Sequence, residues 1–113
     1  MNAGLDEVQG AFRALADPSR RSILMHLSKQ EMTIGEISSR FEMTRAAVKK
    51  HLIILEEGRL ISTRTSGRER INRLEPLAIK QAAEWLNYFS EFWDTKLEKL
   101  QDAVNAAERE KND

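Results

Sequence analysis

The sequence of 113 residues contains no cysteine and only two histidines, His26 and His51. Without cysteine the chain has no disulfide bonds and no thiolate metal ligands. Two histidines are too few for a typical tetrahedral zinc site within one chain, so we expect neither a metal nor a cofactor. Neither histidine has a paired nucleophile at a recognisable spacing, so catalysis is the weakest functional hypothesis.

Long apolar runs are also absent, and none approaches the length of a membrane span. The N-terminal segment MNAGLDEVQGAF lacks the basic region and apolar run of a signal peptide, which predicts a cytoplasmic protein. Hydrophobic residues make up 41% of the chain and charged residues 32%. This balance and length predict one small globular domain with a single core.

A net charge is likewise absent, but the charges are unevenly distributed along the chain. Residues 44–73 carry eight cations and three anions, which leaves +5, whereas residues 76–113 carry five cations and eight anions, which leaves −3. A basic middle segment is typical of a nucleic-acid-binding surface.

Residues 33–60 predict two helices joined by a tight corner, the pattern of a helix-turn-helix. Thr33 is a good N-cap, and Glu36 three positions later completes a capping box. Thr44 is the expected N-cap of the second helix. Gly58 is the expected end of that helix, because glycine tolerates the left-handed conformation.

The second of these helices has two different sides. One side is aliphatic and suits a core, whereas the outer side combines alanines with Lys49 and Lys50. Alanines allow close approach to a duplex and can touch thymine methyl groups, and lysines reach guanine edges or phosphates. The alternative is a solvated amphipathic helix whose lysines serve solubility alone.

Residues 60–65 and 70–74 predict a two-stranded hairpin that turns at Ser66-Gly67. Its strands and tip carry Arg64, Arg68, Arg70 and Arg73. A basic hairpin after a candidate recognition helix is the wing of a winged helix. The alternative is an edge hairpin whose charges only discourage aggregation.

Helical periodicity also predicts terminal helices with apolar stripes. At the N-terminal end the stripe includes Leu5, Val8, Phe12 and Leu15, and Asp17-Pro18 ends the helix. At the C-terminal end, residues 76–104 predict one long helix, followed by a frayed tail at 105–113. The apolar stripe of that long helix includes Trp85, Leu86, Phe89, Trp93 and Leu97.

The domain of about 75 residues that precedes this long helix is too small to cover its stripe. A second copy of the helix could cover it in a two-fold dimer. The alternatives are a helix folded over its own domain, or a ligand pocket at Trp85, Phe89 and Trp93.

Three segments together resemble the ArsR/SmtB family of bacterial regulators. They are FRALADPSRRSIL, TRAAVKKHLIILEEGRLI and RTSGRERINRL. The ending PLAIKQAAEWLNYFSEFWDTKLEKL is similar to a metal-independent branch of the family. The resemblance implies a mostly α winged helix-turn-helix in the order α-α-α-α-β-β-α. Residues 1–113 form a single domain in this scheme, with core and wing at 5–75.

The resemblance further implies a homodimeric repressor that binds a near-palindromic operator through recognition helix 44–57 and wing 60–74. The positions that match base-reading residues of the family are Ala46, Ala47, Lys49 and Lys50. The full set expected at DNA is Thr44, Arg45, Ala46, Ala47, Lys49, Lys50, His51, Arg64, Arg68 and Arg70. The set expected at the dimer interface is Leu5, Val8, Phe12, Trp85, Leu86, Phe89, Trp93 and Leu97.

Metal-sensing members place a cysteine pair where this chain has Ser38 and Arg40, so the resemblance does not extend to metal sensing. A small apolar ligand near Trp85 and Trp93, or control by expression alone, both stay open as the inducing signal. The competing hypothesis for the whole chain is a dimeric winged-helix adaptor that binds another protein and no DNA.

Overall fold

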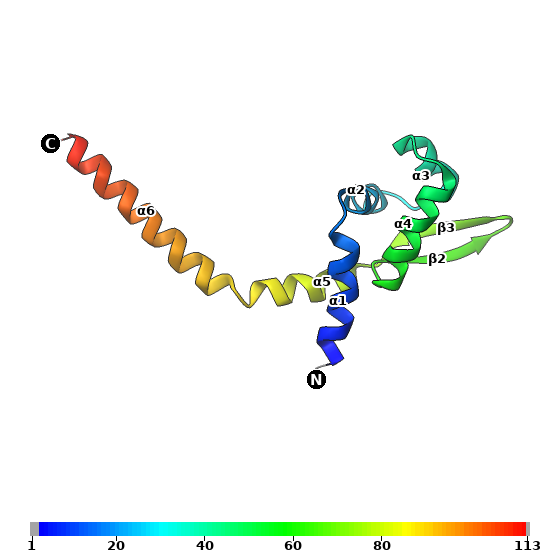
Figure 1. The fold of residues 1–113 in the computed structure, drawn as a ribbon, viewed down its shortest axis with the longest axis horizontal. Coiled ribbons are helices and arrows are strands. Elements are labelled where there is room, and N and C mark those ends of the chain that lie inside the picture. Colours follow the sequence, from blue (N-terminus) through cyan, green and yellow to red (C-terminus); the bar gives the residue numbers. More distant parts are fainter. Residues whose placement is uncertain (1–2, 113) are drawn as a thin grey trace. The chain divides into compact units, whose positions relative to one another are not determined.

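The computed structural model describes the backbone of residues 3–112 and the side chains of residues 8–111. The chain divides into two compact units, the first ending at Ala82 and the second beginning at Ala83. The elements, shown in Figure 1, are α1 (Ala3–Leu15), α2 (Pro18–Leu27), β1 (Met32–Thr33), α3 (Ile34–Phe41), α4 (Arg45–Glu57), β2 (Ile61–Ser66), β3 (Glu69–Leu74), α5 (Pro76–Asn87) and α6 (Ser90–Asn112).

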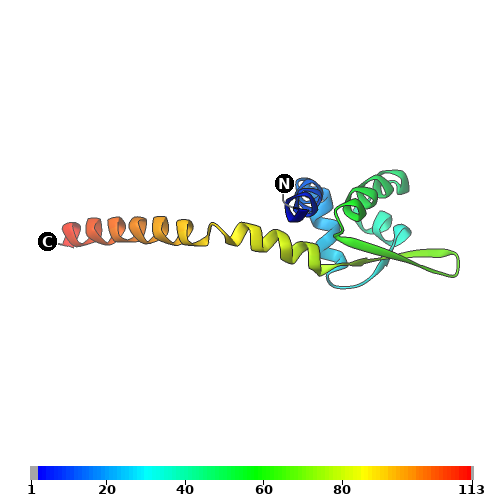
Figure 2. The same cartoon turned by 90° about the horizontal axis from the view of Figure 1, so that it is seen from below.

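The core of the first unit is a cluster of aliphatic side chains drawn from its helices and strands. Ile23 of α2, Ile37 of α3 and Leu55 of α4 are fully buried in it. Ala78 and Ala82 of α5 close the same cluster. Helix α4 lies beside the β2–β3 hairpin in both views of the fold (Figures 1 and 2). The core therefore fixes α4 against the β2–β3 hairpin.

The predicted hairpin is present as β2 and β3. The sheet also has a third antiparallel strand, so that the strand order is β1-β3-β2. The extra strand is β1, in which Met32 pairs with Asn72 and Thr33 with Ile71. Two residues are too short to produce an alternating pattern in a sequence. Because β1 leads directly into α3, this pairing ties the wing to the start of the helix-turn-helix.

Helix α4 ends at Gly58 as predicted, but the predicted left-handed conformation is wrong, because the φ of Gly58 is −79°. The left-handed residue is the next one, Arg59, with φ +61°. Gly58 is instead a point of close approach between α1 and the end of α4. A Cβ atom built on Gly58 would lie 2.7 Å from the carbonyl oxygen of Gly10. Both positions therefore favour glycine, position 58 because it lacks room for a Cβ atom and position 59 because its backbone is left-handed.

These requirements predict opposite changes in stability. Gly58→Ala should lower the free energy of unfolding by roughly 1–3 kcal/mol, because α1 must move away from α4. Arg59→Gly should raise it by up to about 1 kcal/mol, because a left-handed backbone is strained for residues with a Cβ. Urea unfolding followed by circular dichroism measures both. Equal effects of the same sign would contradict this assignment of the two backbone positions.

The single helix predicted at 76–104 is two helices, α5 and α6, separated at Tyr88 and Phe89. The break follows the backbone hydrogen bonds. The Tyr88 N–H is shared between the carbonyls of Glu84 and Trp85, at 3.2 Å each, and the Phe89 N–H bonds to Leu86 O at 3.1 Å. Bonds to the third preceding residue tighten and end an α-helix.

The tail predicted to fray after residue 104 is also helical, because α6 continues to Asn112. The segment AAEREK that follows Asn105 consists of strong helix formers. Its polarity does not oppose a solvent-exposed helix.

Candidate nucleic-acid interface

The helix-turn-helix is built by the local hydrogen bonds that the sequence predicts. The Thr33 side chain accepts from Glu36 N at 3.2 Å, while Glu36 Oε1 accepts from Thr33 N at 3.2 Å. The Thr44 side chain accepts from Ala47 N at 3.1 Å and begins α4. At the corner Glu42 is left-handed, with φ +53°. Both predicted N-caps are therefore confirmed.

Helix α4 presents one buried and one exposed face, as its sequence predicts. Val48, Leu52 and Leu55 are buried in the core. The exposed residues of α4 and its N-cap are Thr44, Arg45, Ala46, Lys49, Lys50, Ile53, Glu56 and Glu57, and Ala47 is half-buried. The outer face is therefore cationic and lined with small residues in its first two turns.

His51 does not share that outer face, although it was included among the residues expected at DNA. It is half-buried, and its Nδ1 atom lies 3.4 Å from Arg20 Nη1 and 3.9 Å from Asp17 Oδ2. Since a guanidinium can only donate, the His51 Nδ1 atom is the acceptor in the Arg20 contact. His51 therefore packs against the start of α2.

Arg20 connects α4 to the carbonyl end of α1. Its Nε donates to Ala14 O at 2.8 Å, and its Nη2 donates to Arg13 O at 3.2 Å. Asp17 caps α2 and accepts from the Arg20 backbone N–H at 3.0 Å, a bond that lowers the pKa of the Asp17 carboxyl. Sequence reasoning missed Arg20, which lies 31 positions from His51.

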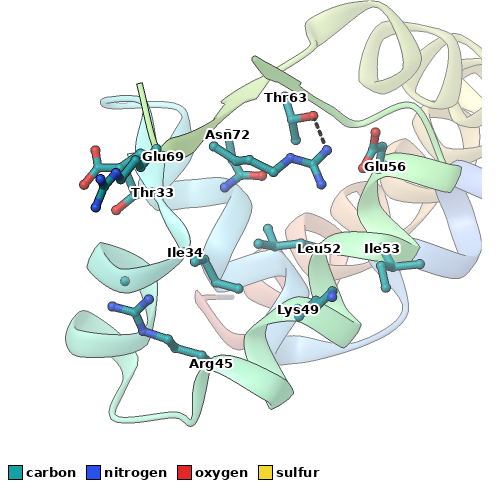
Figure 3. Close-up of a pocket in the computed structure, with 13 residues that line it drawn as sticks. Thr33, Ile34, Arg45, Lys49, Leu52, Ile53, Glu56, Thr63, Glu69 and Asn72 are labelled. Carbon is teal, nitrogen blue, oxygen red and sulfur yellow. Dashed lines mark hydrogen bonds between the residues drawn. The ribbon is translucent and has the colours of Figure 1, made fainter. Parts of the chain in front are cut away.

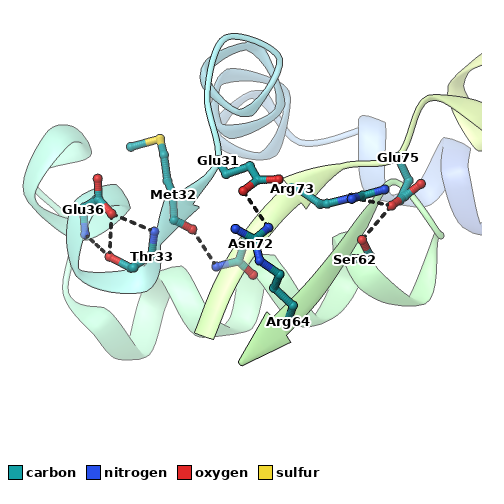
Figure 4. Close-up of polar contacts among 9 residues, drawn as sticks. All are labelled: Glu31, Met32, Thr33, Glu36, Ser62, Arg64, Asn72, Arg73 and Glu75. Carbon is teal, nitrogen blue, oxygen red and sulfur yellow. Dashed lines mark hydrogen bonds and ion pairs between the residues drawn. The ribbon is translucent and has the colours of Figure 1, made fainter. Parts of the chain in front are cut away.

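The arginines of the wing lie on opposite faces of the sheet, because side chains alternate along a strand. On the face shown in Figure 4, Arg64 forms an ion pair with Glu31 at 2.6 Å, and Arg73 forms one with Glu75 at 3.0 Å. Ser62 donates to Glu75 at 2.7 Å, and this bond, followed by those from Arg73, lowers the pKa of the Glu75 carboxyl. The charges on this face are largely neutralised.

Arg68 and Arg70 lie on the side of the wing that borders α4. Arg70 Nη2 donates to Thr63 Oγ1 at 2.9 Å, and the Arg70 side chain faces α4. Arg68 follows the turn at Gly67, and both arginines are exposed. Asn72 on the same strand is buried and donates to Met32 O at 3.2 Å.

A cavity of about 360 Å³ lies between α4 and this side of the wing (Figure 3). Arg45 and Lys49 border it from α4, and Arg68 and Arg70 border it from the wing. The Arg45 guanidinium extends over α3, where a Cβ atom built on Gly35 would lie 2.9 Å from its Nη2 atom. Four of the residues expected at DNA therefore surround one opening.

Unit 2 carries an exposed apolar surface, which we call the α5–α6 seam. Its members are Trp85, Leu86, Phe89, Phe92, Trp93, Leu97, Leu100 and Val104, all exposed. Among the residues expected at the dimer interface from α1, Val8 is buried, Phe12 is half-buried, and the side chain of Leu5 lies outside the described residues. Within the described part of the chain, no helix is long and apolar enough to cross a membrane.

A helix-turn-helix followed by a basic antiparallel hairpin defines the class of winged helix-turn-helix proteins. Residues 17–63 match the family model described as "Bacterial regulatory protein, arsR family". The chain belongs to the ArsR family of regulators and is a DNA-binding transcriptional regulator. The resemblance expected from its sequence is confirmed, and this family consists of regulators, which are not enzymes.

Named relatives agree with this assignment. The HTH-type transcriptional regulator Rv2034 of Mycobacterium tuberculosis is 35% identical over 69 residues, which are 61% of this chain and 64% of that protein. The transcriptional repressor SdpR of Bacillus subtilis is 29% identical over 90 residues, which are 80% of this chain and all of SdpR.

The solved structure of the ArsR family transcriptional regulator RHA00566 superimposes with a TM-score of 0.73 and 33% identity. The match covers 83% of this chain and 97% of that one.

Proposed function

We propose that the protein is a homodimeric repressor that binds a near-palindromic operator. Each copy inserts α4 into a major groove and places its wing against the flanking backbone. The observation that carries the proposal is the joint position of Lys49, Arg68 and Arg70 around one opening. Repression in place of activation is supported by the similarity to SdpR, which is named a transcriptional repressor. A dimer bound across a promoter would block access to that promoter.

Base reading is assigned to the outer face of α4. Ala46 and Lys50 are exposed one turn apart, and Lys49 lies beside them. Small side chains permit close approach, and the lysines reach guanine acceptors or phosphates. Thr44 and Ala47 accompany them at the helix N-terminus, where backbone N–H groups favour phosphate.

Contacts to the DNA backbone are assigned to Arg68 and Arg70, which lie on the α4 side of the wing. Arg64 is left out of this set, because it lies on the opposite face in an ion pair with Glu31. Arg68 therefore serves as the test residue in the wing, and Arg64 serves as its matched control.

Dimerisation is assigned to the α5–α6 seam. Trp93, Leu97, Leu100 and Val104 are spaced by four, three and four positions, which is the spacing of a helix-pairing seam. Trp93 is 61% exposed and Leu97 is 59% exposed. Contiguous apolar surface of this kind marks an interaction site, and a second copy would cover it in a two-fold arrangement.

The wing assignment predicts that Arg68→Ala weakens binding to every duplex several-fold and flattens the salt slope by about one unit. Arg64→Ala should leave both quantities close to those of the parent. Fluorescence anisotropy with operator and scrambled duplexes across a salt series measures these values. Equal losses in the two variants would contradict the assignment of arginines by sheet face.

A further inference from the structure

We propose that the cavity between α4 and the wing binds a small amphipathic organic anion, and that this anion competes with DNA. The inference rests on the proposed function, because it makes the DNA-reading surface itself the site of regulation. It concerns the ligand class and the location of the effector site.

The cavity is built from three separate segments of the first unit. Its floor includes Ile34 of α3, one wall is α4, and the other wall is the strand pair β2–β3 (Figure 3). The volume of about 360 Å³ falls within the range of small-molecule sites. A ligand with a short hydrocarbon body fits this volume.

The charges around the cavity favour a ligand of one charge sign. Its lining contains four cations, Arg45, Lys49, Arg68 and Arg70, against two anions, Glu56 and Glu69, which leaves +2. An anionic head group would be attracted to the cationic side chains, and guanidinium groups bind carboxylates and phosphates well. A cation would meet a net repulsive surface.

The apolar part of the lining selects the body of the ligand. Ile34 and Leu52 contribute aliphatic surface inside, and Ile53 of α4 is 46% exposed beside them. DNA phosphate alone would leave this surface in water. A hydrocarbon chain or ring attached to the anionic head would cover it, with a gain proportional to the area buried.

Competition follows from shared residues. Lys49 and Arg68 border the cavity and also belong to the proposed DNA contacts, so one side chain cannot serve a bound anion and a phosphate together. Occupation would also place a negative charge on the surface that approaches the duplex. The ligand and DNA would therefore bind in mutually exclusive fashion. This differs from a small apolar ligand near Trp85 and Trp93, which is one of the two inducing signals left open by the sequence.

The probe for this site is octanoate, with acetate as the head-group control and 1-octanol as the tail control. Calorimetry on the full chain without DNA measures direct binding, and anisotropy with labelled duplex measures competition. Octanoate should bind and displace DNA at a concentration about tenfold below that of acetate, because its methylene groups add apolar burial. Octanol should not displace DNA.

Two variants test whether octanoate binds in the cavity between α4 and the wing. Thr63→Trp should fill the cavity without changing a charge and should weaken octanoate binding at least about tenfold. Glu56→Gln should strengthen it several-fold, because an acid leaves the lining. Glu56 is exposed on α4, so this variant keeps the core intact if the tryptophan variant fails to fold.

Three results would overturn the inference. Equal potency of acetate and octanoate would show a site for simple oxyanions only. Octanoate binding that is lost in Trp93→Glu but kept in Thr63→Trp would place the ligand on the α5–α6 seam. Duplex binding without any octanoate binding would also reject the site, whereas octanoate binding at the cavity without duplex binding would reject the proposed function instead.

Discussion

The double variant Trp93→Glu, Leu97→Glu should be a folded monomer that binds operator at least about 100-fold more weakly than the parent. The two glutamates place charge in the α5–α6 seam, where burial of an unpaired carboxylate is costly. Once the copies separate, the second recognition helix no longer binds at high effective concentration, which ordinarily contributes a factor of about 10²–10⁴. Sedimentation equilibrium and anisotropy measure the two effects.

Lys99→Ala and Lys99→Glu are the controls for this experiment. Lys99 lies about 120° around α6 from Trp93 and about 160° from Leu97 at about 100° per residue, and Lys99→Glu changes the net charge by −2, as the double variant does. The charge-matched control should stay dimeric. A double variant that remains dimeric, or one that becomes monomeric yet keeps its operator affinity, would refute the dimeric account.

The second large effect is expected from Lys50→Ala, which should reduce discrimination between operator and scrambled duplex by about 1–3 kcal/mol. Lys50 is exposed on the outer face of α4, so its loss should not disturb the core. Anisotropy with both duplexes at one salt concentration gives the difference. The control Lys99→Ala removes the same charge from unit 2. If Lys50→Ala weakens both duplexes equally, Lys50 contacts phosphate and not bases.

Local features of this fold could be predicted because their causes are local. The caps at Thr33 and Thr44 depend on residues within three positions, and the two faces of α4 follow from helical periodicity. The turn at Gly67 likewise has the positive φ that its sequence suggests. These features sufficed to predict the class of fold and the position of the recognition helix.

Features that depend on contacts distant in sequence could not be predicted. The division of wing arginines requires the strand register and the position of Glu31, which precedes the wing by about thirty positions. The Arg20–His51 contact and the approach of Gly10 to Gly58 arise only when α1, α2 and α4 pack together. These contacts determine the structural roles of Arg64, His51 and Gly58, which the residue types alone do not reveal.

The break between α5 and α6 shows a different limit. The apolar stripe continues through Tyr88 and Phe89 without a proline or glycine, so helical periodicity alone predicts one helix. The ring of Phe89 packs edge-on against both Trp85 and Tyr88, with centroid distances of 5.2 and 5.1 Å. Aromatic crowding within one turn is not represented in a hydrophobic pattern.

Selection of bound duplexes from a random pool, combined with native mass measurement of the complex, tests the central claim most directly. The account predicts an inverted repeat whose half-site centres are about one helical turn, near 10 bp, apart, and two chains on each duplex. A single half-site occupied by one chain, or recovery of duplexes without any shared sequence, would contradict it.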